Sequence, residues 1–313
     1  MTEAAHQTAA PSGRPSLTVI VLSFNRKDAL DATLTHLQSI ADLAGTQILV
    51  VDNGSGDGSP AMVAQRHPTV ELIALSQNRG VAAFNAAARA ARGQALLVLD
   101  DGAWPEPGVV ALALDLLARR PELAAITLHP RHPRTRASEW PFGDPPPAAA
   151  GLDGIADRWP VMGCGNIVRR DAWMRAGGYD EAFFLYRNDT DLAMKLRGLG
   201  MGVHFNPEWV VWHDSPAAAR KSKRWFRLAT RNWVWLCRRH GSGASGVAAL
   251  MAGWLHAHAL AGRSPADHLA VARGALSGLL GPMPACPAGA ADARGSSIRD
   301  LLALRRAARR HRR

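Results

Sequence analysis

Two adjacent carboxylates, Asp100 and Asp101, follow directly on an apolar run at residues 95–99. A run of this length bounded by turn residues predicts a buried strand, which Gly102 and Pro105 end. Carboxylates at the end of a buried strand are costly to desolvate unless a cation, a hydroxyl group or a backbone donor meets them. Because ligands of open α/β sheets bind outside the carboxyl ends of the strands, we expect a ligand site here. The alternative is an acidic turn that caps the next helix.

A second apolar run, residues 48–51, ends in a carboxylate in the same way, at Asp52. The loop that follows, residues 53–58, is rich in glycine. Gly54 and Gly56 stand where a calcium loop needs oxygen ligands, and the spacing differs from the G-x-G-x-x-G pattern of dinucleotide-binding loops. The loop therefore belongs to neither class, and Asp52 is the acidic end of a second strand.

The second half of the chain has one dense stretch, residues 176–197, in which aromatic residues lead into Asp189 and Asp191 at the start of a helix. Acidic residues suit the positive end of a helix, and Asp191 pairs with Lys195 at i,i+4 spacing, so Asp191 has a sufficient structural explanation. Asp189 is less well explained as a helix cap, because a cap does not require the aromatic residues that precede Asp189.

Alternating strands and helices are expected to position these carboxylates. Apolar runs typical of strands alternate with helical patterns, which predicts an α/β protein with a mostly parallel, doubly wound sheet. The expected strands are residues 17–23, 48–51, 70–75, 95–99, 124–128 and 203–213, and the expected helices include residues 28–40, 80–91, 108–119 and 189–199. Residues 134–160 are rich in proline and aperiodic, which predicts a long loop over the ligand crevice.

The net charge of +11 is distributed unevenly: residues 1–214 carry −4, residues 215–266 carry +9 and residues 267–313 carry +6. A basic C-terminal third favours an anionic partner such as a membrane surface, a phosphorylated lipid or a nucleic acid. Three widely spaced cysteines fit a reducing compartment, and residues 1–16 show no signal peptide. Residues 247–261 are too short and too polar to span a bilayer, which favours a buried helix.

Seven motifs in order resemble the family 2 glycosyltransferases, in particular rhamnosyltransferase-like members, with their GT-A nucleotide-sugar fold. The motifs are TVIVLSFNR at 18–26, VVDNGS at 50–55, NRG at 78–80 with Asn85, LDDGA at 99–103, GGYDEAFF at 177–184, NDTDL at 188–192 and the segment 207–213. They span residues 17–213, about two thirds of the chain. Each motif is weak alone, but their order implies a GT-A fold, a mostly parallel sheet with flanking helices, followed by a basic helical extension.

The resemblance implies roles for the residues at the strand ends. Ser23 and Asn25 would lie beside the base and ribose of a nucleotide. Asp52 would accept a hydrogen bond from the base, which suits a uracil or thymine imide, and Asp100 would contact the ribose or the metal site. Mg²⁺ or Mn²⁺, or basic side chains, would neutralise the leaving diphosphate.

The resemblance also assigns the catalytic chemistry. Asp189 matches the catalytic base, which takes the proton of the acceptor hydroxyl as that oxygen attacks the anomeric carbon and inverts its configuration. Asp101 and His213 are the candidate metal or diphosphate contacts, although a lone histidine at a strand end is more often structural. Asp191 and Trp104 are expected to contact the acceptor or to support the site.

Two positions depart from the family pattern. Gly102 stands where the acidic motif usually ends in a second metal-binding aspartate, which predicts weak metal binding. Asn188 stands where a glutamate usually precedes the base, and the loss of one negative charge should lower the pKa of Asp189 slightly. Without a metal, basic residues such as those at 220–231 are expected to neutralise the leaving group.

The resemblance fades after His213. Residues 220–239 show an amphipathic pattern of tryptophan and arginine, typical of a helix that lies on an anionic membrane or of one that packs under a catalytic domain. No nucleic-acid motif accompanies the charge, so nucleic acid is not an expected partner. The expected division is a disordered N-terminus (1–16), a GT-A catalytic domain (17–214), a basic, tryptophan-rich helical extension (215–280) and a linker with an arginine-rich tail (281–313).

The sequence therefore predicts an inverting glycosyltransferase, cytoplasmic or peripheral on the inner face of the membrane. It would move a sugar from a UDP- or dTDP-sugar to a hydroxyl of a lipid-linked glycan, an envelope saccharide or a related acceptor. The alternative is a catalytically impaired GT-A pseudoenzyme that serves as a binding or scaffold module. In this alternative, Gly102 reflects the loss of metal binding. A dinucleotide-dependent enzyme is disfavoured because the glycine-rich fingerprint is missing.

Overall fold

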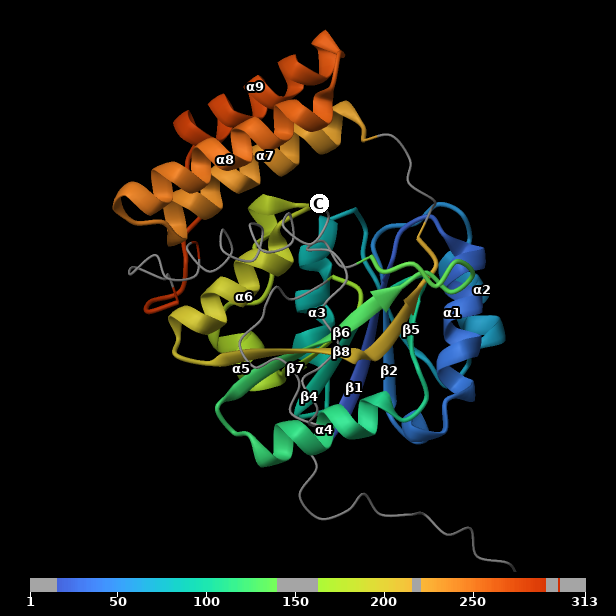
Figure 1. Cartoon of the computed structure of the whole chain (residues 1–313). Helices are drawn as coiled ribbons and strands as arrows, with labels where there is room; N and C mark the ends of the chain where they lie inside the picture. Colours follow the sequence, from blue (N-terminus) through green and yellow to red (C-terminus); the bar gives the residue numbers. More distant parts are fainter. Residues whose placement is uncertain (1–15, 140–162, 216–220, 291–297, 299–313) are drawn as a thin grey trace, which may run out of the picture.

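The computed structural model describes residues 16–139, 163–215, 221–290 and 298. Within them, eight strands form one sheet in the order β3-β2-β1-β4-β7-β6-β8-β5 (Figure 1). The strands are β1 (Leu17–Ser23), β2 (Gln47–Asp52), β3 (Glu71–Ala74), β4 (Ala95–Asp100), β5 (Ala103–Pro105), β6 (Leu123–Arg131), β7 (Asn166–Arg169) and β8 (Gly202–His213). β1 to β4 run parallel, as do β6 and β8, whereas β7 and β5 are antiparallel to their neighbours. The expected α/β fold with a mostly parallel sheet is confirmed.

The register of β1 brings the acidic strand ends together. β1 lies between β2 and β4, with Ser23 opposite Asp52 and Leu22 opposite Asp100. Since parallel strands end at the same edge of a sheet, the carboxylates predicted separately from two apolar runs face one region.

Helices cover both faces of the sheet because the apolar side chains of the buried strands alternate between the two faces. Val19 and Val21 of β1 pack into one core, and Ile20 packs into the other. The first core is closed by α1 (Lys27–Ser39), α2 (Ser59–Arg66) and α4 (Val109–Arg119), and the second by α3 (Phe84–Ala90), α5 (Arg170–Arg175) and α6 (Asn188–Gly198) (Figure 1).

The segment expected as one helix at residues 80–91 is a 3₁₀ helix, Gly80–Ala83, followed by α3. Gly80 has a φ of +62°, and a Cβ at this position would lie 2.0 Å from the carbonyl oxygen of Phe184. The same oxygen accepts a hydrogen bond from the backbone nitrogen of Val81 at 2.9 Å. This close approach of a distant loop shapes the start of the segment, and helical periodicity does not encode it.

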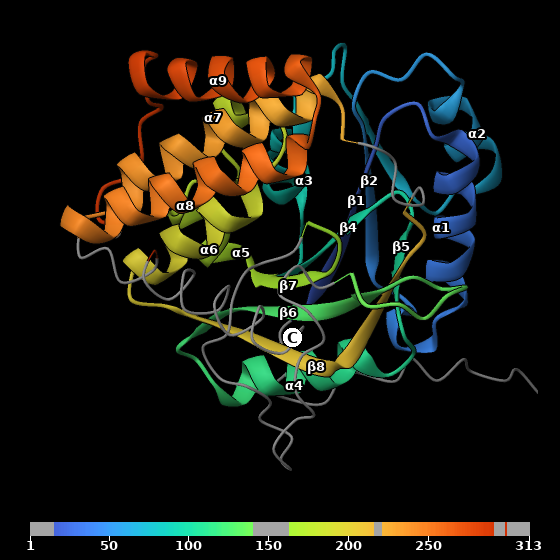
Figure 2. The ribbon, with the colours of Figure 1, turned by 45° about the horizontal axis from the view of Figure 1, so that its top comes forward.

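Three further helices form an extension that lies over α3 and α6 (Figures 1 and 2). They are α7 (Lys223–His240), α8 (Gly243–Ala261) and α9 (Pro265–Leu280). Trp233, Trp235 and Leu236 of α7 are buried in the same core as α3 and α6. The structure thus shows the packing alternative for the part of this segment that forms α7: the apolar face of α7 is covered by the protein.

Helix α8 is not the buried helix expected at residues 247–261. Its packing face is built of small residues, and a Cβ on Gly253 would lie 1.9 Å from the indole nitrogen of Trp233. Val247, Met251 and Leu255 point outward and are 63%, 51% and 64% exposed. The prediction was wrong because an apolar composition does not show how many faces of a helix are covered. None of the described helices has the length and apolarity needed to cross a membrane.

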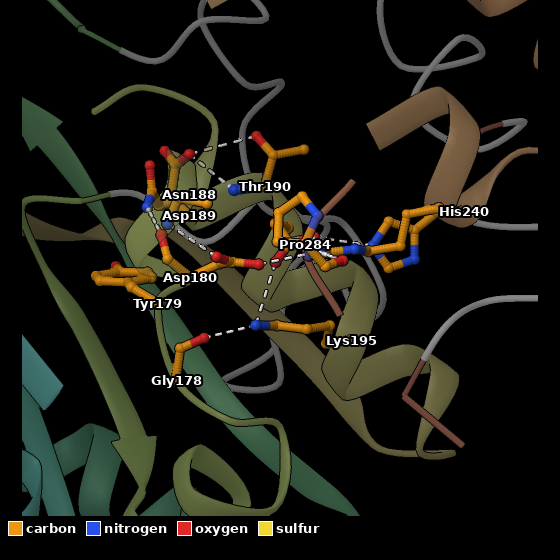
Figure 3. Close-up of polar contacts among 12 residues, drawn as sticks. Gly178, Tyr179, Asp180, Asn188, Asp189, Thr190, Lys195, His240 and Pro284 are labelled. Carbon is orange, nitrogen blue, oxygen red and sulfur yellow. Dashed lines mark hydrogen bonds and ion pairs between the residues drawn. The ribbon is translucent and has the colours of Figure 1, made fainter. Parts of the chain in front are cut away.

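A buried carboxylate, Asp191 of α6, joins the extension to the sheet domain. Figure 3 shows two of its partners, Lys195 and His240. Its Oδ1 accepts a hydrogen bond from Arg239 Nη1 at 2.8 Å and lies 3.0 Å from His240 Nε2, and its Oδ2 lies 3.1 Å from Lys195 Nζ. Burial alone would raise the pKa of Asp191, but Lys195, His240 and Arg239 hold it well below its usual range. The expected i,i+4 pair with Lys195 is present, and Arg239 and His240 of α7 complete the cluster.

We predict that Asp191→Asn destabilises the protein by about 3 kcal/mol, because it leaves the buried cation of Lys195 without a countercharge and that of Arg239 with Asp180 alone. Urea unfolding at neutral pH measures the loss. Since the pKa of Asp191 is lowered, the difference from wild type should be complete above the ordinary aspartate pKa of about 4 and shrink only as the pH falls below it. The matched control is Asp171→Asn on the exposed first turn of α5, with a cost within about 0.5 kcal/mol. Equal unfolding midpoints for the two variants would contradict the role of Asp191.

Candidate active site

Asp101 lies in the turn after β4 and is held by the end of β1. Ser23 Oγ donates to Asp101 Oδ2 at 2.9 Å, and Arg26 Nη1 donates to Asp101 Oδ1 at 2.8 Å. Asp101 is 5% exposed. Burial raises the pKa of Asp101, and the charge of Arg26 opposes the rise. Both carboxylate oxygens therefore already have partners within the protein.

Asp52 lies at the end of β2, beside a loop closed by Asn25. The Asn25 side chain accepts a hydrogen bond from the backbone of Gly56 at 2.8 Å, and its backbone nitrogen donates to Ser55 Oγ at 2.9 Å. Asp52 Oδ2 accepts a hydrogen bond from the backbone of Ser55 at 3.0 Å. Asp52 Oδ1 is buried and has no hydrogen-bond partner among the described residues. A buried acceptor without a donor is costly, so this oxygen suits a donor group on a ligand.

His213, at the end of β8, lies between two carboxylates. Its Nδ1 is 2.6 Å from Glu139 Oε2, and its Nε2 is 4.0 Å from Asp100 Oδ2. Burial alone would lower the pKa of His213, but Cys164, Glu139 and Asp100 raise it above its ordinary value. The two neighbouring carboxylates therefore favour the protonated form of His213.

Asp100 keeps an accessible carboxylate, since 39% of its side chain is exposed. Because protein surrounds it on most sides, desolvation raises its pKa to about 6; His213 opposes the rise, while Asp101 adds to it. The charge of Asp189 adds to it as well, so the structure brings Asp100 and Asp189 within electrostatic range of each other.

These residues leave few free ligands for a divalent cation. Such an ion commonly binds through one or two carboxylates together with substrate phosphates and water. The carboxylate of Asp100 is accessible, but both oxygens of Asp101 are engaged, and a Cβ on Gly102 would lie 3.2 Å from the carbonyl oxygen of Asp214 and 3.6 Å from Arg26 Nη2. Among the described residues no group of three or more histidine, cysteine or acidic side chains could hold a metal ion. The guanidinium group of Arg26 lies close to Gly102, the position at which the family pattern has a second aspartate.

Asp189 is the second residue of α6 and is half-buried. It does not cap the helix: the N-cap is Arg187, without a side-chain cap bond. Burial raises the pKa of Asp189, while hydrogen bonds from Thr190 and the charge of Arg187 oppose the rise. Figure 3 shows its carboxylate turned away from Lys195 and toward Thr190. A carboxylate with a raised pKa and no ion pair among the described residues is a suitable general base.

The loop that leads to Asp189 is held by α7. Within residues 184–187, three side-chain-bearing residues adopt φ between 61° and 70°, a conformation that L-residues rarely populate. Asn232 Nδ2 lies 2.8 to 3.0 Å from three carbonyl oxygens of residues 183–186. Arg231 Nη2 donates to carbonyl oxygens of residues 182 and 183, at 2.8 and 3.1 Å. These contacts stabilise a strained approach to the candidate base.

The remaining predicted residues have supporting positions. Asp191 is completely buried in its ion cluster, so it supports α6. Trp104 of β5 stacks on His36 of α1, with ring centroids 4.2 Å apart. Sequence reasoning missed Glu139 and Asn232 as parts of the site, named Arg231 only as the end of a basic range, and included Arg26 only as the last residue of the first motif. The position of Arg26 in the first motif was the only available signal.

Solved glycosyltransferase structures share this fold. Residues 1–349 of S. aureus TarS superpose with a TM-score of 0.62 at 14% identity, covering 94% of this chain and 87% of that chain. A mannosyltransferase from Pyrobaculum calidifontis, solved with GDP-Man and Mn²⁺, gives a TM-score of 0.56 at 23% identity, covering 96% and 83%. The fold and the acidic strand ends thus define a glycosyltransferase of the GT-A class.

The chain belongs to glycosyl transferase family 2, whose family model matches residues 18–176. A curated relative is the N-acetylglucosaminyl-diphospho-decaprenol L-rhamnosyltransferase of Mycobacterium tuberculosis, 25% identical over 70% of this chain and 86% of the relative. The expected family and enzyme class, a glycosyltransferase, are confirmed. The individual roles of the site residues stay predictions.

We predict that wild-type protein binds Mn²⁺ weakly in the presence of UDP, and that Gly102→Asp alone tightens binding only modestly, because Arg26 would pair with the new carboxylate. The double variant Gly102→Asp with Arg26→Gln should bind Mn²⁺ most tightly, since two carboxylates then lack a cationic partner. Electron paramagnetic resonance titration of free Mn²⁺ measures the affinities. If wild type binds as tightly as the double variant, Gly102 and Arg26 do not limit metal binding.

Proposed function

We propose that the chain is an inverting glycosyltransferase that moves a sugar from a UDP- or dTDP-sugar to a hydroxyl of a lipid-linked glycan or envelope saccharide. The donor class is supported by the Oδ1 atom of Asp52, at the carboxyl end of β2. This oxygen is buried and has no hydrogen-bond partner among the described residues. Uracil and thymine carry an N3–H group, which can donate to this oxygen. Ser23 is the last residue of β1, Asn25 follows two residues later, and both are proposed to line the base and ribose.

The proposed reaction uses the chain's own groups. Asp189 accepts the proton of the acceptor hydroxyl while that oxygen attacks the anomeric carbon, and the nucleoside diphosphate leaves from the opposite side of the sugar. The leaving group gains negative charge, so positive charge near it lowers the barrier. Arg26 and His213 are cations that the structure places among the strand-end carboxylates, and we assign this role to them.

The acceptor class rests on relatives. The mycobacterial relative is named for a sugar-diphospho-decaprenol acceptor. Another relative is named the O-antigen biosynthesis protein RfbC of Myxococcus xanthus, 24% identical over 66% of this chain and 18% of that protein. We therefore propose a lipid-linked acceptor, a cell-envelope pathway, and a position on the cytoplasmic face of the membrane.

One observation favours a second function. Gly102 and the engaged oxygens of Asp101 remove the usual metal ligands, which suits a pseudoenzyme that binds nucleotide without turnover. The raised pKa of Asp189 favours catalysis instead, because a scaffold has no need of a carboxylate kept free of ion pairs with the described residues.

We predict that Asp189→Asn lowers transfer by about 10²- to 10⁴-fold and leaves nucleotide binding nearly intact. The acid limb of the wild-type kcat/KM profile should lie above pH 3.8, because the raised pKa means that the base is protonated at a higher pH than an ordinary aspartate. The matched control is Glu181→Gln, an exposed carboxylate on the same segment. Normal turnover by Asp189→Asn would rule out this base, and no turnover by wild type would favour the pseudoenzyme.

We predict that UDP or dTDP raises the melting temperature of the wild-type protein more than CDP does. Cytosine has a lone pair at N3 where uracil has N–H, so CDP would set two acceptors against each other at Asp52. Asp52→Asn, which can donate, should reduce or reverse the preference of UDP over CDP. Thermal shift with the three nucleotides is the measurement, and an unchanged preference in Asp52→Asn would remove Asp52 from base recognition.

A further inference from the structure

A basic recess of about 470 Å³ lies between the first halves of α7 and α9. Four cations line it: Lys223, Arg224 and Arg227 from α7 and Arg273 from α9. Its remaining lining is apolar, formed by Ala266, Leu269 and Ala270. The recess therefore combines concentrated positive charge with a hydrocarbon surface.

The charge of this recess is not neutralised within the described chain. No ion pair joins any of its four cations to a described acidic residue. A Cβ on Gly274 of α9 would lie 2.3 Å from the carbonyl oxygen of Arg227, and one on Gly278 would lie 2.8 Å from that of Arg231, so the two helices run side by side in the same direction. Both positive helix ends therefore lie on the side of the recess, and they add to its preference for an anion.

An apolar stripe leads away from the recess along α9. Leu269, Leu276 and Leu280 lie at i, i+7 and i+11, hence on one face, and are 51%, 57% and 78% exposed. Leu269 also lines the recess. An anionic group held by the four cations could thus continue into a hydrocarbon chain on the leucine face.

The recess borders the loop that leads to the candidate base. The guanidinium carbon of Arg224 lies 4.9 Å from the ring centroid of Phe184, and the ring of Trp225 lies 5.9 Å from that of Tyr186. Phe184 and Tyr186 precede Asp189 by five and three residues. A ligand in the recess would therefore lie next to the loop that precedes Asp189.

We propose that the recess binds the phosphate or diphosphate group of a lipid-linked acceptor, with the lipid chain along the leucine face of α9. This proposal deepens the proposed function and rests on its acceptor class. It gives the basic residues of α7 a role that differs from neutralising the leaving diphosphate of the donor.

The test is equilibrium binding of the full chain to phosphatidylcholine vesicles at about 0.15 M salt. One set of vesicles carries a long-chain polyprenyl diphosphate, a second carries phosphatidylglycerol at equal surface charge, and a third carries neither. Soluble pyrophosphate is tested as a competitor. The variant is Arg227→Gln with Arg273→Gln, and the control is Arg175→Gln with Arg263→Gln, two exposed arginines outside the recess whose loss changes the net charge equally.

Wild type and the control should bind polyprenyl diphosphate vesicles at least tenfold more tightly than phosphatidylglycerol vesicles. The recess variant should lose about tenfold or more, since each cation near an anionic lipid contributes about fivefold. Equal losses in variant and control, or no preference over phosphatidylglycerol, would overturn the proposal. Binding of pyrophosphate as tight as that of the lipid would overturn the part assigned to the hydrocarbon chain.

Failure of this proposal is separable from failure of the proposed function. The melting-temperature response to UDP reports the donor site and should be equal in wild type, recess variant and control. A normal UDP response without lipid diphosphate binding would refute the recess alone, whereas lipid binding without any nucleotide response would refute the transferase function alone.

Discussion

The buried carboxylate of Asp191 is the interaction on which the arrangement of the site depends. A lone buried charge would cost several kcal/mol, so Asp191 can stay ionised only while Lys195, Arg239 and His240 surround it. Two of these partners come from α7, which fixes α6 against the extension. Asp189 lies two residues earlier on the same helix, and Asn232 of α7 holds the carbonyls of the loop before it. The extension therefore holds both the helix that carries the candidate base and the loop that precedes it.

The same rule, that a buried carboxylate needs a cation or donor, divides three aspartates of the candidate site into two groups. Asp101 is satisfied by Ser23 and Arg26 inside the protein. Asp52 retains an oxygen without a described partner, and Asp189 retains a carboxylate without a described ion pair. The first group shapes the site, and the second is available to ligand and substrate. This sorting explains why three acidic motifs of similar appearance in the sequence receive different proposed functions.

The sheet, its mostly parallel order and the place of its acidic edge could be predicted from the sequence, because buried strands and their ends are encoded locally by apolar runs and turn residues. Asp191 and Lys195 were predictable for the same reason, as neighbours on one helix. Arg26, Glu139 and Asn232 were not, since each acts on a residue 46 or more positions away in the chain, through packing that no local pattern records. The predictions for residues 80–91 and for α8 were wrong for the same reason. The 3₁₀ turn at Gly80 depends on contact with Phe184, and the exposed face of α8 depends on which of its faces other helices cover.

Helix α7 carries two kinds of basic residue, and burial distinguishes them. The Arg239 side chain is buried and forms ion pairs with both Asp180 and Asp191, so its charge stabilises the fold. Arg224 and Arg227, at the other end of the helix, are exposed and lack a described acidic partner. An amphipathic pattern alone treats these arginines as equivalent, which is why it favours membrane binding and internal packing equally. The structure shows internal packing for one part of the helix and leaves a basic surface at the other, next to the loop of the candidate base. One helix can thus anchor the fold at its C-terminal end and face an anionic acceptor at its N-terminal end.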